Sequence, residues 1–266
     1  MNIIKTTLFA LATLASIGAS AQKNNWQLVW HEEFNEDGKL NEKIWNYENG
    51  FVRNHEDQWY QADNAWCERG LLIIEGRTEK RPNPLFNKDG NDWRTSRDSI
   101  KYTSSCITTQ GKFNFLYRRL EVRARIPVTG GAWPAIWTLG EGIEWPSCGE
   151  IDIMEVMGQD TKKAMGTIHY GNPHGQKQGE YVLKNGDFSS QWHTFSVEWE
   201  PGKIVWYVDG IKFHEANDWY STTEGQGTVA YPAPFDQKFY MILNLAIGGS
   251  WVGYPDDKTT YADQSY

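Results

Sequence analysis

Short strand-like runs, some alternating between apolar and polar residues and some apolar throughout, recur along this sequence and limit the folds open to it. The clearest example is residues 120–126, where apolar and charged side chains take alternate positions. A period of two is typical of a β-strand with one buried face. Further strand-like runs lie at residues 71–75, 195–199, 203–208 and 239–247. Nothing between them keeps a helical period beyond a turn or two, so the sequence predicts an all-β sandwich or barrel.

The length and the charge narrow the class of protein further. A chain of 266 residues fits a single all-β domain, since such domains commonly reach about 200–250 residues. The formal net charge is −8, and no block of lysine and arginine occurs. An acidic chain has no general attraction for nucleic acid or for anionic lipid. We therefore expect no nucleic-acid partner, and the charge also argues against a heavily sulfated substrate.

The N-terminal segment, residues 1–21, has the features of a secretory signal peptide. Lys5 precedes an apolar run that ends near Ile17, and Ala19-Ser-Ala21 supplies the small residues after which a signal peptidase cuts. The apolar run is too short to span a bilayer comfortably, so membrane insertion is not expected. We expect cleavage after Ala21, a secreted or periplasmic protein, and one domain over residues 22–266.

The chain has three cysteines, Cys67, Cys106 and Cys148. Their spacing matches no zinc-binding pattern, and the odd number leaves at least one thiol unpaired. We interpret them as small buried residues, with a single disulfide as the alternative.

Three carboxylates gather in one short segment, at Glu150, Asp152 and Glu155. In a regular strand Glu150 and Asp152 share a face, and Glu155 lies on the opposite one, where burial of its charge would be costly. One extra residue, a β-bulge, returns Glu155 to the acidic face. We predict that the extra residue is Met154 and that Ile151 and the isoleucine after Asp152 fill the core behind the acids.

Acids that share one face repel one another, which raises the proton affinity of at least one of them. Glycoside hydrolysis uses such a set, because one carboxylate must be ionised while another carries a proton. A calcium site and a solvated edge strand are the alternative interpretations of the segment. The alternating isoleucines favour a strand with a buried back face over a solvated edge.

Aromatic residues are unusually abundant, with 14 Trp, 13 Tyr and 11 Phe in the chain. Tryptophan combines a flat apolar face with a polar N–H group, which suits stacking on sugar rings. Core packing is the ordinary role of any single tryptophan, but the set near the acidic segment is interpreted as a carbohydrate-binding surface. Its members are Trp133, Trp137, Trp145 and Trp251.

With these motifs in this order, the chain resembles glycoside hydrolase family 16, in its laminarinase-like branch. The acidic segment is the most specific match, and the matches run through nearly all of the chain after the signal peptide. They lie at residues 28–34, 102–104, 108–113, 133–137, 145–155, 166–169, 192–193, 209–210 and 242–249. The resemblance implies a β-jelly roll, a sandwich of two curved antiparallel sheets with a substrate cleft on its concave face.

The resemblance also implies roles for individual residues. Glu150 matches the nucleophile, Glu155 matches the general acid and base, and Asp152 matches the residue that hydrogen-bonds the nucleophile and tunes its protonation. For His169 a purely structural role is the alternative to substrate contact. The candidate substrate-binding residues are Trp133, Trp137, Asn54, Glu56, His169, Trp145 and Trp251.

The implied activity is endo-hydrolysis of a β-glucan polysaccharide with retention of configuration. The five-residue step from Glu150 to Glu155 belongs to the bulged form of the motif, which favours β-1,3- or mixed β-1,3/1,4-glucans. The alternatives are an endo-galactanase resembling an agarase, a transglycosylase, and a non-catalytic β-glucan-binding module, which the presence of both glutamates disfavours. No cofactor is expected to be required, and a monomer is expected.

Family members usually have one further strand after the segment that matches residues 256–266, whereas this sequence ends at Tyr266. If this is the whole protein, the domain is expected to lack its last strand and to leave a sheet edge unpaired. An aspartate of that strand often helps to bind a structural calcium ion. The rest of such a calcium site would lie near Glu33 and Gly50.

Overall fold

The computed structural model describes residues 26–127, 129–223 and 227–256. The chain divides into two units, one ending at His31 and one beginning at Glu32. In the first unit the described residues, 26–31, form no helix or strand. The predicted signal peptide and the segment after residue 256 lie outside the described residues.

The resemblance implies an opening strand at residues 28–34. No strand is formed there, so this prediction was wrong. Residues 26–35 take part in no helix or strand, and the side chains of Leu28 and Val29 are 80 % and 71 % exposed. A strand is stable only when it pairs with neighbours and buries a face. The segment joins no sheet here, although Trp30 and Phe34 are half-buried.

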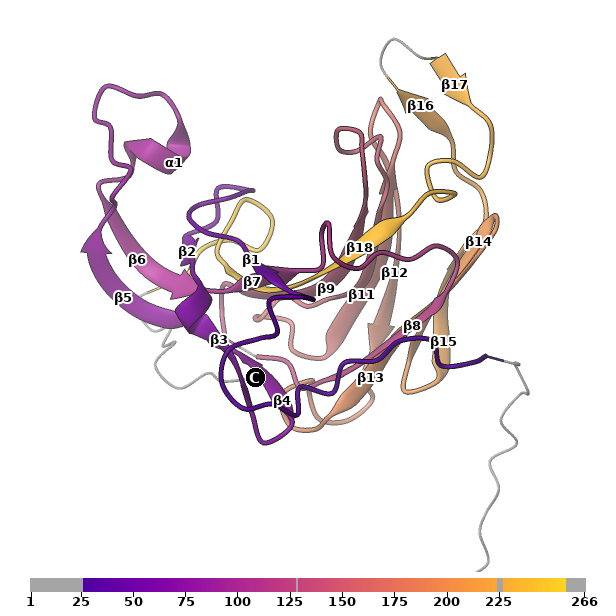
Figure 1. Ribbon diagram of the computed structural model, residues 1–266, viewed down its shortest axis with the longest axis horizontal. Helices are drawn as coiled ribbons and strands as arrows, with labels where there is room; N and C mark the ends of the chain where they lie inside the picture. Colours follow the sequence, from indigo (N-terminus) through magenta and orange to yellow (C-terminus); the bar gives the residue numbers. More distant parts are fainter. Residues whose placement is uncertain (1–25, 128, 224–226, 257–266) are drawn as a thin grey trace, which may run out of the picture. The chain divides into compact units, whose positions relative to one another are not determined.

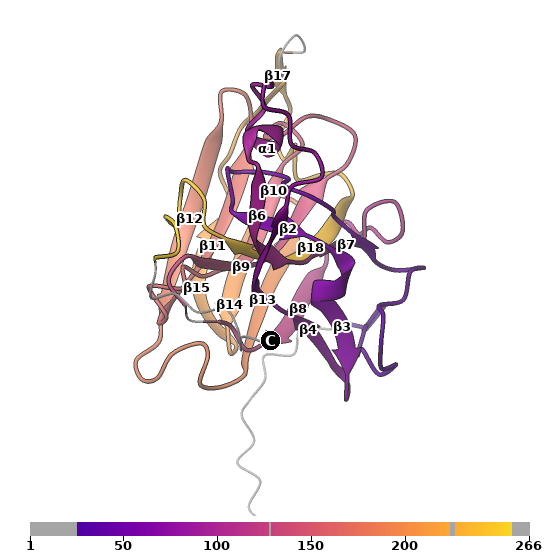
Figure 2. The same ribbon diagram turned by 90° about the vertical axis from the view of Figure 1, so that its left-hand side faces the viewer.

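The larger sheet has seven antiparallel strands, and the carboxylate segment, which Figure 2 labels as β10, lies near its centre (Figures 1 and 2). The last strand in the chain, β18, coincides with the predicted run at 239–247 and lies between strands that come earlier in the sequence. In spatial order the strands are β1 (Asn46–Tyr47), β7 (Cys106–Thr108), β18 (Phe239–Ile247), β9 (Ala132–Gly140), β10 (Glu150–Glu155), β11 (Lys163–Tyr170) and β12 (Gly175–Val182).

The second sheet has four antiparallel strands, and it contains three of the predicted runs. In spatial order they are β15 (Ile211–Ala216), β14 (Lys203–Val208), β13 (His193–Glu200) and β8 (Arg119–Ala124). Asp209 and Gly210 join β14 to β15, with φ angles of 50° and 77°. Two consecutive left-handed residues form the tight hairpin turn that the sequence predicts at this position.

The two sheets pack face to face, and Trp206 of β14 lies between them. Its indole Nε1 donates a 2.7 Å hydrogen bond to the carbonyl oxygen of Asp152 on β10. Gly166 on β11 leaves room for this ring, because a Cβ there would lie 2.4 Å from its Cδ1. Ile151 and Ile153 are fully buried on the same side of β10. The interior therefore holds the backbone of the acidic strand from behind.

Smaller elements border the main sheets (Figures 1 and 2). One is a short helix, α1 (Trp93–Ser96), and another is the 3-10 turn at Ala62–Asn64. The short strands are β2 (Gln58–Tyr60), β3 (Ala65–Glu68), β4 (Leu71–Ile74), β5 (Arg77–Pro82), β6 (Ser99–Ser104), β16 (Ser221–Thr223) and β17 (Gly227–Val229). The strand predicted at 71–75 is thus confirmed as β4.

The sequence predicts long loops at residues 80–99 and 171–179, because neither region keeps a strand-like apolar pattern, but both contain secondary structure. Residues 80–99 include the end of β5 and the whole of α1, and residues 171–179 are mostly the start of β12. The long loop predicted at 171–179 was wrong, because only a tight turn at 171–174 separates β11 from β12. Glycine and glutamine weaken the apolar pattern of β12, but its eight pairings with β11 hold it in the sheet.

The three cysteines, Cys67, Cys106 and Cys148, are buried and unpaired. This confirms the interpretation that they are small buried residues.

Over the described part of the chain, no helix has the length and apolar character needed to cross a membrane.

Candidate active site

A β-bulge in β10 controls where the three carboxylates point. Between Asp152 and Met154 the register against β9 shifts by one residue, which makes Ile153 the extra residue. Against β11 the shift falls between Asp152 and Glu155. The predicted bulge is therefore confirmed, although Ile153 and not Met154 is the residue that it inserts. Both side chains are 1 % exposed, so the bulge buries two apolar neighbours in succession.

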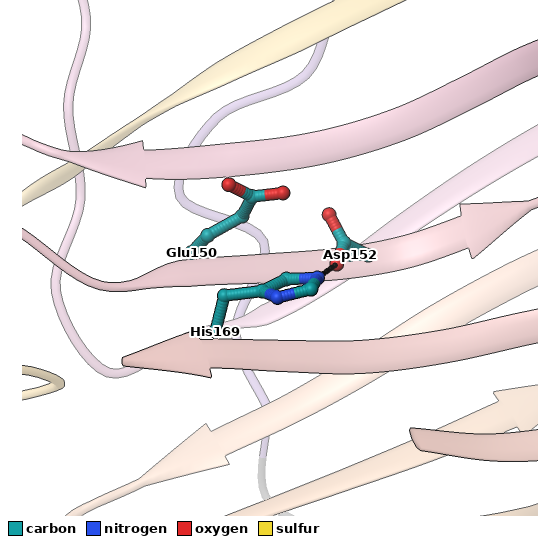
Figure 3. Close-up of side chains that lie close together, drawn as sticks. All are labelled: Glu150, Asp152 and His169. Carbon is teal, nitrogen blue, oxygen red and sulfur yellow. Dashed lines mark ion pairs between the residues drawn. The ribbon is translucent and has the colours of Figure 1, made fainter. Parts of the chain in front are cut away.

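The carboxylates of Glu150 and Asp152 lie beside the imidazole of His169 (Figure 3). His169, on β11, is the cross-strand partner of Glu150. Its Nε2 lies 3.3 Å from Oδ2 of Asp152. The structure therefore places His169 directly against Asp152, with Glu150 close by.

Each of the two glutamates has an indole donor of its own. Nε1 of Trp145 donates to Oε2 of Glu150 over 2.6 Å, and Nε1 of Trp133 donates to Oε1 of Glu155 over 3.0 Å. A hydrogen bond to a carboxylate stabilises its ionised form. The predicted tryptophans thus act directly on the carboxylates, one at each end of β10.

Burial of the acids together raises their proton affinities. Burial and repulsion from Glu150 raise the pKa of Glu155 to about 7. The pKa values of Glu150 and Asp152 are also raised, by burial first and then by the neighbouring carboxylate. Since each added negative charge repels those already present, the cluster retains a proton near neutral pH. Such a cluster can supply an ionised and a protonated carboxyl group side by side.

Glu150, Asp152 and His169 form the one group in the described part of the chain with the spacing of a metal site. Ligand atoms of Glu150, Asp152 and His169 lie within 4.8 Å of one another. Two carboxylates and an imidazole suit several divalent cations. A cation held there would, however, occupy the carboxylate of Glu150 and block it from acting as a nucleophile. The calcium site predicted near Glu33 and Gly50 stays a prediction.

Two of the predicted substrate-binding residues are buried. Trp137 is 8 % exposed, and its Nε1 donates a 2.7 Å hydrogen bond to Asn244. Glu56 is 2 % exposed and accepts hydrogen bonds from Asn54 and Gln58. These side chains support the acidic face from within the protein, and their contact with substrate stays a prediction.

The other predicted contacts are accessible. Trp251 is 41 % exposed, and its ring lies 5.0 Å from that of Trp133. Asn54 is exposed, and its backbone oxygen approaches Gly249 next to the same pair of rings. Trp145 is 51 % exposed beside Glu150. Open aromatic surface is therefore present near both glutamates.

Sequence reasoning missed two residues near the site. Asn244 joins Trp137 to the hydroxyl of Tyr60, to which its Nδ2 donates over 3.0 Å. His174 lies in the turn after β11, with its Nε2 2.9 Å from Nδ1 of His169. No local pattern marks either residue, because each acts on a partner that only strand pairing or the turn geometry brings close.

Comparisons with known proteins agree with this geometry. Residues 77–263 match the family Glycosyl hydrolases family 16. The chain is 34 % identical over 85 % of its length to glucan endo-1,3-beta-glucosidase A1 of Niallia circulans, of which it spans only 34 %. It is 32 % identical over 95 % of its length to a beta-glucanase of Rhodothermus marinus, of which it spans 88 %.

Solved structures show the same relationship. The laminarinase catalytic domain of Thermotoga maritima is 37 % identical, with a TM-score of 0.74 over 89 % of this chain and 93 % of that one. A structure described with endo-acting O-glycanases of the human gut microbiota is 32 % identical, with a TM-score of 0.81 over 91 % and 88 %. The bulged acidic strand, the two packed sheets and these similarities have one explanation: the chain belongs to glycosyl hydrolase family 16 and is a jelly-roll glycoside hydrolase.

Proposed function

We propose that the protein is a secreted, retaining endo-β-glucanase that hydrolyses β-1,3- or mixed β-1,3/1,4-glucans. One observation carries the proposal: the bulge in β10 sets Glu150 and Glu155 on one face, each with a separate indole donor. Double displacement at a sugar needs two carboxyl groups with different tasks. The named relatives, which include an endo-1,3-beta-glucosidase and a beta-glucanase, support the substrate class.

In the first step Glu150 attacks the anomeric carbon and forms a covalent glycosyl-enzyme. Glu155, whose pKa of about 7 keeps a proton available, protonates the leaving glycosidic oxygen at the same time. In the second step Glu155 takes a proton from water, the water attacks the anomeric carbon, and Glu150 is released. Asp152 lies beside both Glu150 and His169, and its charge raises the pKa of the nucleophile.

A second candidate substrate is a β-galactoside-containing glycan. The specific observation in its favour is a relative, the keratan-sulfate endo-1,4-beta-galactosidase of Sphingobacterium multivorum, which is 29 % identical over 86 % of this chain and of which the chain spans 51 %. The same acids would perform the same chemistry on either sugar. A galactanase therefore differs from a glucanase in its sugar-contacting residues and not in Glu150 or Glu155.

The proposal includes export, with cleavage after Ala21, and a monomeric enzyme that requires no cofactor. The N-terminal sequence and the acidic charge are the observations that support export without a membrane or nucleic-acid partner. A calcium ion near Glu33 would stabilise the fold and would take no part in the chemistry.

The test is product analysis on four polymers: laminarin, barley mixed-linkage glucan, agarose and unsulfated poly-N-acetyllactosamine. Oligosaccharides from laminarin or barley glucan would support the glucanase, and the anomeric form of the first product, followed by NMR, would test retention. Products from the galactose-containing polymers alone would replace the first candidate with the second. Binding without products would favour the non-catalytic module.

A further inference from the structure

His174 occupies the tight turn between β11 and β12 and forms an edge-to-edge pair with His169. Its Nε2 lies 2.9 Å from Nδ1 of His169. The two ring planes are only 19° apart, and their centroids are separated by 5.1 Å. Nearly parallel planes at that separation, with a short contact between nitrogens, mean that the rings lie side by side. The hydrogen bond therefore runs close to the plane of both imidazoles.

His174 also contacts Trp145, the hydrogen-bond donor of Glu150. Its ring centroid lies 4.9 Å from that of Trp145, whose Nε1 donates to Glu150. His169, whose ring centroid lies 5.1 Å from that of His174 and 6.1 Å from that of Trp145, approaches Asp152. One side chain outside the acidic strand thus supports the partners of two of its carboxylates.

The turn that carries His174 is fastened by residues from another part of the chain. The hydroxyl of Thr222 on β16 exchanges hydrogen bonds with the backbone N–H and carbonyl of Asn172. Tyr220 donates its hydroxyl proton to the carbonyl of Pro173 over 2.9 Å. The carbonyl of Thr222 also accepts from Ser147, two residues after Trp145. The loops of His174 and Trp145 therefore share one anchor.

The hydrogen bond between the imidazoles determines which nitrogen of His169 carries its proton. In a neutral imidazole one nitrogen donates and the other accepts. If His174 donates from Nε2, Nδ1 of His169 must be the acceptor, and the proton of His169 then lies on Nε2, toward Asp152. Burial and the adjacent His169 lower the pKa of His174, which favours the neutral form that this arrangement uses.

We propose that His174 is a positioning residue of the active site: it holds the Nε2–H tautomer of His169 toward Asp152 and supports the ring of Trp145 beside Glu150. This inference rests on the proposed function for its effect on rate, but its structural part concerns only the imidazoles. Outer partners that fix the tautomer of metal-ligating histidines are worth about 10- to 100-fold, and for His169 we expect an effect at the lower end of that range.

The test compares His174→Phe with His174→Gln. Phenylalanine keeps a ring against Trp145 but has no N–H, whereas glutamine offers an amide N–H to His169. We expect H174F to lower kcat by about tenfold with KM within about twofold, and H174Q to restore most of kcat. His31→Phe, a histidine-to-phenylalanine change outside this cluster, is the matched control. Wild-type kcat in H174F, or a loss confined to KM, would overturn the proposal.

A second measurement reads the tautomer without activity. Nitrogen-15 NMR of the imidazoles should show His169 protonated on Nε2 in the wild type and H174Q, and a mixture of tautomers in H174F. An unchanged His169 tautomer in H174F would overturn the inference, even if the wild type cleaved none of the four polymers and the proposed function failed. Should H174F not fold, Thr222→Val combined with Tyr220→Phe, which removes the side-chain hydrogen bonds to Asn172 and Pro173, must lower kcat in the same way.

Discussion

The indole of Trp133 on β9 donates a 3.0 Å hydrogen bond to Glu155, the last residue of β10. Glu150, at the other end of the same strand, receives its own donor from Trp145. The two donors are independent because they come from different segments on either side of β10. Each glutamate therefore has its own hydrogen-bond donor, while repulsion between the carboxylates still links their pKa values. Separate donors suit a pair of carboxyl groups with opposite tasks.

The pH dependence of the wild-type enzyme should report Glu155. As the general acid it must be protonated, and its pKa is raised to about 7. The rate should therefore fall as the pH rises through about 7, with kcat/KM decreasing tenfold per pH unit beyond it. Measurement of kcat/KM from pH 4 to pH 9 checks this. An activity that stays level up to pH 9 would contradict the role given to Glu155.

Two matched tryptophan variants should move opposite limbs of that profile. Trp133 lowers the pKa of Glu155 by its hydrogen bond, so Trp133→Phe should shift the alkaline limb to higher pH. Trp145 lowers the pKa of Glu150 in the same way, so Trp145→Phe should shift the acidic limb upward, since the nucleophile must be ionised. The same set of kcat/KM profiles shows both. If both variants moved the same limb, the separate roles would be wrong.

The charge of Glu155 should make the fold less stable at alkaline pH. Its folded pKa of about 7 lies above the ordinary value of 4.5, so this contribution to stability is present below about pH 4.5 and is lost as the pH rises through about 7. The full loss corresponds to about 3 kcal/mol. Glu155→Gln should therefore gain stability over the wild type at pH 8 and much less at pH 4.5, as measured by urea unfolding. An equal difference at both pH values would contradict the raised pKa.

The buried amide of Asn244 should contribute to stability and to the shape of the site. Asn244→Leu removes the acceptor of Trp137 and the donor to Tyr60. Leaving buried polar groups without partners costs about 1–3 kcal/mol each. We expect a destabilisation of about 2 kcal/mol or more by chemical unfolding. The exposed Ile211→Asn, at the hairpin of the other sheet, serves as the control and should change stability little.

The fold and the central chemistry could be predicted from the sequence because both rest on local patterns. Alternation predicted the strand at 120–126, and a continuous apolar run predicted the one at 239–247. The unfavourable burial of Glu155 in a regular strand required the bulge. Which residue the bulge inserts depends on pairing with β9, so Ile153 and not Met154 was found only in the structure.

Other features depend on tertiary contacts that no local pattern records. Trp137 and Trp145 both lie near the acidic segment in the sequence, but Trp137 is 8 % exposed and Trp145 is 51 % exposed. The difference arises because β18 brings Asn244 against Trp137. His174 acquires its partner only when the tight turn folds β12 back onto β11. The segment at 28–34 matches the opening strand of the family but joins no sheet here.

The most direct test of the account is the hydrolysis of laminarin and of barley mixed-linkage glucan by the wild type, Glu150→Gln and Glu155→Gln. The account predicts oligosaccharide products from at least one polymer with the wild type, none detectable with E150Q, and a rate lower by about 10²–10⁴ with E155Q. Products from E150Q at the wild-type rate would contradict the role of Glu150 as the nucleophile. Wild-type protein that releases no product from either glucan would contradict the proposed β-glucanase activity.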